Sequence, residues 1–257
     1  MKNILLFAAL LFNILAANAQ KLPNIQIASI KAPANTKIDG KPTEWPEMQA
    51  YNKATEVAYT LANDANNLYL VIQTKDPDII HRIVNGRITF TINRADKKSE
   101  DNAVAISYPV FEKNNRPGLA LREKLTSPKV GDSLMLINNK RLETTAKLIK
   151  VTGVKGVDTL ISVYNDNGIK AASAFDNKML YTCEIAVSLK LIGLAGDKFA
   201  YNVRLNGVSF DDVPGINIKR GADGQITAID IHKDQMTSTP QVMTAPTDFW
   251  AEYTLVK

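Results

Sequence analysis

The feature that most constrains the fold is a long series of short strand-like segments, separated by turn residues at hairpin-like spacing. Residues 56–61 alternate loosely between polar and apolar side chains, and the polar residues 63–67 favour a turn. Residues 68–73 then form an almost continuous apolar run. Because turn chemistry lies between the two segments, we expect them to pair as a β-hairpin.

Comparable segments follow along the rest of the chain. Residues 87–93 alternate cleanly, which is typical of a strand with one buried face. Further strands are expected within residues 104–108, 146–151, 159–164, 169–175, 179–187, 198–210 and 249–256. Segments at this spacing favour antiparallel pairing over a parallel α/β sheet. The sequence therefore predicts an all-β fold, an antiparallel β-sandwich of roughly ten strands.

Helical periodicity is scarce, so we expect one or two short helical turns at most. Residues 188–194 favour one such turn, with Ser188 as the cap and Gly193 or Gly196 near its end. Residues 109–139 carry few signals of either kind and are expected to form a long insertion. The chain shows no fixed-period repeat and no Pro/Ser-rich linker, so residues 20–257 are predicted to form a single β-sandwich domain.

The first nineteen residues have the three parts of a cleavable signal peptide. Lys2 supplies the positive charge, residues 4–12 are apolar, and Ala17, Asn18 and Ala19 form the cleavage site. The apolar run is shorter than the roughly 20 residues that a membrane-spanning helix needs. We therefore expect residues 1–19 to be removed and the remainder to be exported to the periplasm or secreted, with no membrane span.

Composition excludes an internally disulfide-bonded fold and argues against a nucleic-acid-binding protein. The chain contains one cysteine, Cys183, so no internal disulfide can form, and its apolar surroundings predict a buried strand thiol. The formal net charge is +5, but the lysines are scattered among acidic residues. Because nucleic-acid binding requires clustered positive charge, we expect no nucleic-acid partner.

The order of four short blocks resembles the family 9 carbohydrate-binding modules. Residues 37–45 (KIDGKPTEW) are similar to the opening block of that family, and residues 62–72 to its LYL hairpin. Residues 181–189 and 196–203 are similar to two of its later strands, and residues 248–255 to its closing strand. The resemblance covers much of residues 36–256. It implies a β-sandwich and, by analogy, the binding of carbohydrate or of another extracellular or cell-envelope polymer.

The resemblance also suggests roles for particular aromatic residues. Family members grip sugars chiefly with a pair of tryptophans on loops, whereas this chain has only Trp45 and Trp250. Trp45 falls in the opening block with Asp39 and Gly40, and Trp250 in the closing strand, so all four are expected to be structural, with both tryptophans in the core. Tyrosines could replace the missing tryptophans, and the candidates near strand ends or loops are Tyr51, Tyr108 and Tyr164.

Loop carboxylates raise the question of a structural calcium ion, which takes about six to eight oxygen ligands. The candidate metal ligands are Asp64, Asp76 and Asp78. Their alternative role is turn chemistry, in which Asp side chains accept hydrogen bonds from nearby backbone groups. No other cofactor is expected.

The best lead for an enzyme is the tetrapeptide at residues 131–134 (GDSL), which matches the motif of the GDSL esterases. In that family the serine is the nucleophile, and a late Asp-x-x-His supplies the base. Here the tetrapeptide lies mid-chain in a β-rich sequence, and the late histidine gives Asp230-Ile231-His232, one residue too close. We therefore interpret the match as coincidental and expect no enzymatic activity.

Two functions follow from these observations. The first is an exported, non-catalytic protein that binds carbohydrate or a related polymer. The alternative is a structural or partner-binding subunit of the cell envelope that has lost sugar binding, because loop tryptophans are missing. The spatial arrangement of the aromatic side chains distinguishes them.

Overall fold

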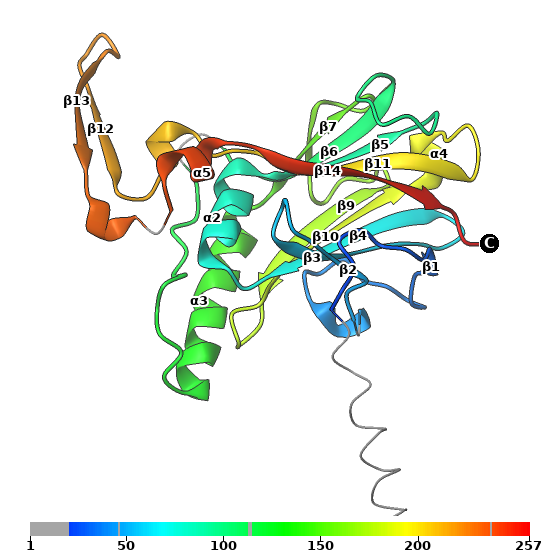
Figure 1. Ribbon diagram of the computed structural model, residues 1–257, viewed down its shortest axis with the longest axis horizontal. Helices are drawn as coiled ribbons and strands as arrows, with labels where there is room; N and C mark the ends of the chain where they lie inside the picture. Colours follow the sequence, from blue (N-terminus) through cyan, green and yellow to red (C-terminus); the bar gives the residue numbers. More distant parts are fainter. Residues whose placement is uncertain (1–20, 46, 113–114, 237) are drawn as a thin grey trace, which may run out of the picture.

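The computed structural model describes residues 21–45, 47–112, 115–236 and 238–257, so the predicted signal peptide lies outside the described residues. Two six-stranded sheets form the upper and lower layers in Figure 1. Among the described strands, every pairing is antiparallel except that of β1 with β3. The predicted fold class, an antiparallel β-sandwich, is confirmed.

The two sheets differ in their strand order. Sheet A runs β1 (Ile30–Lys31), β3 (Val57–Asn63), β4 (Asn67–Thr74), β10 (Tyr181–Ser188) and β9 (Ile169–Phe175), and β2 (Ala50–Asn52) also pairs with β3. Sheet B runs β14 (Thr247–Thr254), β11 (Lys198–Leu205), β5 (Ile88–Asn93), β6 (Ala103–Val110), β7 (Leu148–Thr152) and β8 (Leu160–Ser162). Strand β9 is thus an edge of sheet A.

The core lies between the two sheets. Alternating strand residues bring Leu61 and Ile72 of sheet A against Phe90 and Val203 of sheet B, and all four are at most 1% exposed. The Tyr59 and Tyr201 hydroxyls meet across the layers at 3.2 Å. Cys183 is buried among these side chains, as predicted, and burial raises the pKa of its thiol.

The outer face of sheet A is covered by the N-terminal segment that precedes β2. Its opening block surrounds Glu184, whose residue is fully buried on β10. The backbone N–H groups of Asp39 and Gly40 donate to Glu184 Oε2 at 2.9 and 2.7 Å, and Trp45 Nε1 donates to Oε1 at 3.0 Å. The structure therefore places Asp39, Gly40 and Trp45 around a buried carboxylate on a distant strand.

Gly40 cannot be replaced without strain. Its φ of +77° lies in the left-handed region, and a Cβ atom there would lie 2.5 Å from the carbonyl carbon of Ser173 on β9. The opening block thus packs directly against the edge strand of sheet A.

Trp250 does not lie in the core. On β14 the buried residues are Phe249, Ala251 and Tyr253, so the alternating residue Trp250 lies on the outer face of sheet B, where it is partly exposed. The sequence signal for a closing strand is confirmed, but the expectation of a buried tryptophan is wrong because the strand register turns it outward.

Two full helices correct the expectation of one or two short helical turns. Helix α2 (Pro77–Gly86) begins where Asp76 accepts hydrogen bonds from the N–H groups of Asp78 and Ile79. Helix α3 (Pro128–Thr145) lies largely within the segment expected to be an insertion, with Ser127 as its cap. The short helix α4 (Leu189–Ile192) follows Ser188 and ends at Gly193 in the left-handed conformation, as predicted.

The buried stripe of α3 explains why it carries little hydrophobic periodicity. Its buried residues are Gly131, Leu134, Asn138 and Leu142, at helical spacing, but only two of them are apolar side chains. Asn138 is fully buried and exchanges two hydrogen bonds with the backbone of Ala120, at 2.9 and 3.1 Å. A glycine and a buried polar side chain thus occupy half of the positions at which an apolar stripe is expected.

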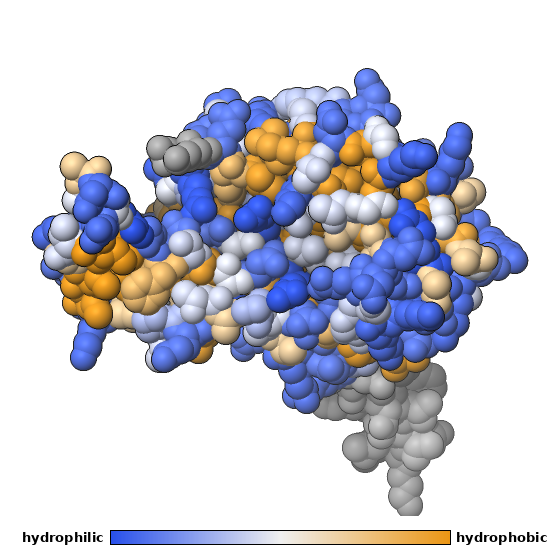
Figure 2. Space-filling model, turned by 90° about the horizontal axis from the view of Figure 1, so that it is seen from above, coloured by the Kyte–Doolittle hydropathy of each residue, from blue (hydrophilic) through white to orange (hydrophobic). Residues whose placement is uncertain are grey.

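A separate two-stranded hairpin, β12 (Ile216–Arg220) and β13 (Ile226–Ile231), projects from the body (Figure 1). From the sequence, no strand is expected in this segment. Its paired isoleucines lie on one face: Ile216 is packed at the root, whereas Ile229 and Ile231 are 45% and 56% exposed. Figure 2 shows hydrophobic surface gathered on this projection.

The remaining short elements are the 3-10 turns η1 (Pro42–Glu44), η2 (Phe210–Asp212) and η3 (Lys233–Gln235), and helix α5 (Pro240–Thr244). The described residues thus contain fourteen strands where roughly ten were expected. Among the described residues, none of the helices has the length and apolar character needed to cross a membrane.

Candidate binding pocket between β9 and α3

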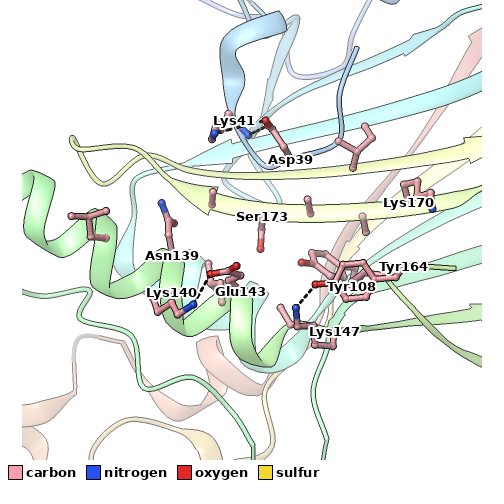
Figure 3. Close-up of a pocket in the computed structure, with 18 residues that line it drawn as sticks. Asp39, Lys41, Tyr108, Asn139, Lys140, Glu143, Lys147, Tyr164, Lys170 and Ser173 are labelled. Carbon is pink, nitrogen blue, oxygen red and sulfur yellow. Dashed lines mark hydrogen bonds and ion pairs between the residues drawn. The ribbon is translucent and has the colours of Figure 1, made fainter. Parts of the chain in front are cut away.

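An open cavity of about 1050 Å³ lies where the edge strand β9 faces helix α3. Residues of β9 form one wall, and the C-terminal half of α3 with the residue Lys147 that follows it forms another. The loop between β8 and β9 and the inner residue Tyr108 of β6 close one end (Figure 3). Four stretches of the chain therefore meet at this site, namely residues 38–41, Tyr108, residues 136–147 and residues 163–174.

The side chain of Asn139 attaches helix α3 to β9 by acting as a strand partner. The Asn139 amide donates to the carbonyl of Phe175 at 2.9 Å and accepts from its N–H at 2.7 Å. Gly131 gives a second close approach, since a Cβ atom there would lie 2.1 Å from the carbonyl oxygen of Asn177. The helix is thereby fixed beside the edge strand with a gap between them.

The edge of β9 is left open inside this gap. Phe175 turns its backbone groups toward Asn139, and the carbonyl of Ile169 accepts from Asn165 at 2.8 Å. Backbone direction alternates along a strand, so Ala171 and Ser173 also direct their N–H and C=O groups to this free edge. Neither residue's backbone has a hydrogen-bond partner from another segment in the described part of the chain. Two N–H donors and two C=O acceptors are therefore free on the β9 wall of the cavity.

Tyr164 provides an exposed aromatic ring at the rim. It is 71% exposed, in the turn that follows β8. Lys147 donates to its hydroxyl, and the Lys147 ammonium lies 4.7 Å from the ring centroid. Lys170 of β9 donates to the carbonyl of Asn165, the residue that follows Tyr164. Two lysines from different walls of the cavity thus hold the turn that carries the ring.

Positive charge exceeds negative charge at the cavity. Its lining includes Lys41, Lys140, Lys147 and Lys170, but only two carboxylates, Asp39 and Glu143. Lys140 pairs with Glu143 at 3.1 Å, and Lys41 lies 3.9 Å from Asp39. The other two lysines have no carboxylate partner among the described residues.

The inner wall contains buried hydroxyl groups. Tyr108 is only 3% exposed, so it is not the rim residue that was expected. Its hydroxyl and that of Tyr181 lie near the Ser173 hydroxyl, but Ser173 Oγ and the Tyr181 hydroxyl have no hydrogen-bond partner among the described atoms. Burial raises the pKa of both tyrosines, so both phenols stay neutral.

The structure brings together two of the three tyrosines predicted as ligand contacts. Tyr164 and Tyr108 both line the cavity, although only Tyr164 is exposed. Tyr51 lies on β2, 40% exposed, beside a separate hollow of about 330 Å³ that is also lined by Gln73 and Asp76. The cavity lysines and Asn139 were not predicted as site residues. They become neighbours only in the folded protein, where helix α3 lies beside β9 and the turn that precedes it.

The three candidate calcium ligands serve separate local structures. Asp64 accepts from the N–H groups of Asn66 and Asn67 and from the Tyr69 hydroxyl, and Asp76 is the cap of α2. Asp78 accepts from Ser238 at 2.6 Å and pairs with Arg122 at 3.6 Å. No group of three or more His, Cys, Asp or Glu residues within the described ranges is arranged to hold a metal ion.

The GDSL tetrapeptide lies in the first turns of α3. Ser133 Oγ donates to the carbonyl of Lys129 in its own helix at 2.9 Å, and Asp132 accepts from Asn177 at 3.0 Å. Asp230 pairs with Lys219 on the projecting hairpin at 2.8 Å. Each of these side chains thus bonds to its own helix or to a nearby surface partner.

No protein-family model matches the chain, and no curated protein matches it. Among solved structures, it is similar to a carbohydrate-binding module of family 9 from Caldicellulosiruptor kristjanssonii in complex with glucose. The similarity covers 89% of this chain and 95% of that one, at 10% identity and a TM-score of 0.35.

Proposed function

We propose that this protein is an exported, non-catalytic carbohydrate-binding protein, and that the cavity between β9 and α3 is its ligand site. The observation that carries the proposal is the exposed ring of Tyr164 beside an open strand edge. A sugar ring has apolar C–H faces and a rim of hydroxyls. It therefore needs both an aromatic surface and fixed hydrogen-bonding groups.

The cavity offers both kinds of contact. The Tyr164 ring is 71% exposed, and Ala171 and Ser173 direct unpaired backbone N–H and C=O groups into the cavity from its β9 wall. Small-molecule pockets usually measure about 300–1,000 Å³. A cavity of about 1050 Å³ has room for more than one sugar ring.

Binding without catalysis is supported by the placement of the carboxylates. Glycoside hydrolysis normally uses two carboxyl groups that face each other across the scissile bond. Here Glu143 projects from α3, whereas Asp39 lies on the other side of β9 (Figure 3). Each also has a neighbouring lysine. This separation by a strand supports a binding site over an acid and nucleophile pair.

Export is supported by the N-terminal sequence, in which Lys2, the apolar residues 4–12 and the Ala17-Asn18-Ala19 site follow the pattern of a signal peptide. Expression of the full chain in a bacterial host, followed by mass measurement of the protein outside the cytoplasm, tests this part. A mature chain beginning at Gln20 is expected. Full-length protein retained in the cytoplasm would contradict export without affecting the ligand site.

The ligand site is tested by binding of mature protein to an array of plant, fungal and bacterial polysaccharides, followed by calorimetry on the best ligand. Replacement of Tyr164 by Ala should weaken binding at least about tenfold, equivalent to about 1.4 kcal/mol. Tyr51→Ala is the matched control, because Tyr51 is also an exposed tyrosine but lies outside the cavity. Its affinity should equal that of the wild type.

Two results would overturn the proposal. If both tyrosine variants have the same affinity as each other, the ligand does not bind in this cavity. Failure of the folded wild-type protein to bind any polysaccharide would contradict carbohydrate binding and favour the alternative, a partner-binding subunit of the cell envelope.

A further inference from the structure

The lysines of the cavity fall into two pairs with different partners. Lys140 is matched by Glu143, and Lys41 has Asp39 nearby, so these four charges largely compensate one another. Within the described part of the chain, Lys147 and Lys170 instead donate to neutral groups, the Tyr164 hydroxyl and the carbonyl of Asn165. A neutral acceptor satisfies a hydrogen bond but leaves the positive charge of an ammonium group uncompensated.

These two charges lie at the exposed ring. Lys147 follows α3 and Lys170 is on β9, so they approach the Tyr164 turn from opposite walls of the cavity (Figure 3). Lys147 is only partly exposed, which reduces its hydration and strengthens its attraction for an anion. A ligand stacked on Tyr164 would therefore have two cations within its immediate surroundings.

Neighbouring acids do not cancel this charge. Four lysines and two carboxylates line the cavity, which leaves a net charge of +2. Asp166 belongs to the same turn but does not line the cavity, and it forms no ion pair among the described residues. Even if Asp166 is counted, positive charge remains in excess at the rim.

We propose that the cavity selects anionic sugars, with Lys147 and Lys170 as the specificity-determining residues that bind a carboxylate or sulfate group on a sugar ring stacked against Tyr164. This inference rests on the proposed carbohydrate-binding function and specifies its ligand class. Lysine acts as a point charge and lacks the planar fork of arginine, so it does not by itself distinguish carboxylate from sulfate. The shared chemistry is an anionic group on a sugar ring.

The test uses matched polysaccharides that differ only in charge. One pair is a glucan with and without carboxymethyl groups, and the other is a galactan with and without sulfate groups. At low ionic strength the wild-type protein should bind the charged member of at least one pair about tenfold more tightly, and the pair that shows the preference identifies the anion. Because exposed charges are screened by salt, the preference should largely disappear at 1 M salt, where the Debye length is about 3 Å.

Two double variants assign the effect to residues. Lys147→Gln with Lys170→Gln should bring the ratio of charged-ligand to neutral-ligand affinity to about one. Both lysines also hold the turn that carries Tyr164, so the measured quantity is this ratio within each variant and not the absolute affinity for a neutral ligand. Lys53→Gln with Lys129→Gln is the control, since it lowers the net charge equally at two lysines that do not line the cavity. Circular dichroism and unfolding curves of each variant establish that the fold is retained.

The outcomes separate the two proposals. Loss of preference in the cavity variant alone supports the inference. Equal binding of charged and neutral polysaccharides in a manner that depends on Tyr164 overturns the inference and leaves the proposed function intact. Preference that survives in the cavity variant, or that falls equally in the control, also overturns it. Absence of binding to all four polysaccharides and to the polysaccharide array overturns both.

Discussion

The buried carboxylate of Glu184 predicts an unusual dependence of stability on pH. It accepts two backbone N–H groups, from Asp39 and Gly40, and the indole N–H of Trp45. Burial raises the pKa of this carboxyl from 4.5 to about 7, against the lowering effect of the three hydrogen bonds. The raised pKa means that the folded state binds a proton more tightly at Glu184 than the unfolded chain does.

The sign of the effect follows from proton linkage. Between the unfolded pKa of 4.5 and the folded pKa of about 7, the folded protein retains the Glu184 proton and the unfolded chain loses it. Stability from this group is therefore fully present below pH 4.5 and is lost as pH rises through 7. A pKa difference between 4.5 and about 7, at about 1.4 kcal/mol per unit, corresponds to about 3 kcal/mol of unfolding free energy.

Urea unfolding of the mature protein at intervals from about pH 4.5 to 8 measures this dependence. The comparison is with Glu184→Gln, which does not titrate, because other groups also contribute to the pH profile of the wild type. At low pH the variant should be less stable by about 1–3 kcal/mol, since an amide NH₂ would face one of the three N–H donors. As pH rises, the difference between the two proteins should shift by about 3 kcal/mol in favour of the variant.

Glu47→Gln is the control, because Glu47 is exposed on the segment that covers sheet A. Its pH profile should parallel that of the wild type. The reasoning is refuted if the wild type and Glu184→Gln show the same pH dependence, or if the wild type gains stability relative to the variant as pH rises.

Two further predictions concern the helix and the hairpin. Asn139→Ala removes both hydrogen bonds to the Phe175 backbone and should lower the free energy of unfolding by about 1–3 kcal/mol, measured by urea denaturation. A loss below about 0.5 kcal/mol would show that Asn139 does not attach α3 to β9. On the hairpin, Ile216→Ala should cost about 2–5 kcal/mol because this side chain is 5% exposed. Ile229→Ala, at 45% exposure, should cost much less, and equal losses would contradict the described packing of the hairpin.

Much of the sandwich could be predicted because its strands carry a local signal. Residues 87–93 alternate, and β5 indeed buries Ile88, Phe90 and Ile92. The same logic failed for Trp250, because the sequence shows that a strand is present but not which face of it meets the core. Its place in the closing strand suggested a buried tryptophan, whereas the register of β14 decides its orientation.

Helix α3 could not be predicted for a different reason. Gly131 and Asn138 occupy half of its buried stripe, and they are residues that helix patterns normally exclude from an apolar face. Both residues suit this buried face only because of partners outside the helix. Gly131 allows the close approach of the Asn177 carbonyl, and Asn138 hydrogen-bonds to the Ala120 backbone. Since α3 forms one wall of the cavity, its lysines could not be assigned to a site before the helix was located.

The opening block contributes to the cavity through its backbone and not through its tryptophan, which is structural as expected. Trp45 is 4% exposed and bonds to Glu184, so it offers no surface to a sugar. The Glu184 carboxylate also fixes the backbone of Asp39 and Gly40, and Gly40 lies directly against Ser173 of the edge strand. The block therefore positions one side of the cavity, while the exposed aromatic ring of the cavity lining is that of Tyr164. Ligand-binding variants of the rim should accordingly be measured at a fixed pH, because protonation of Glu184 changes the stability of the segment that holds it.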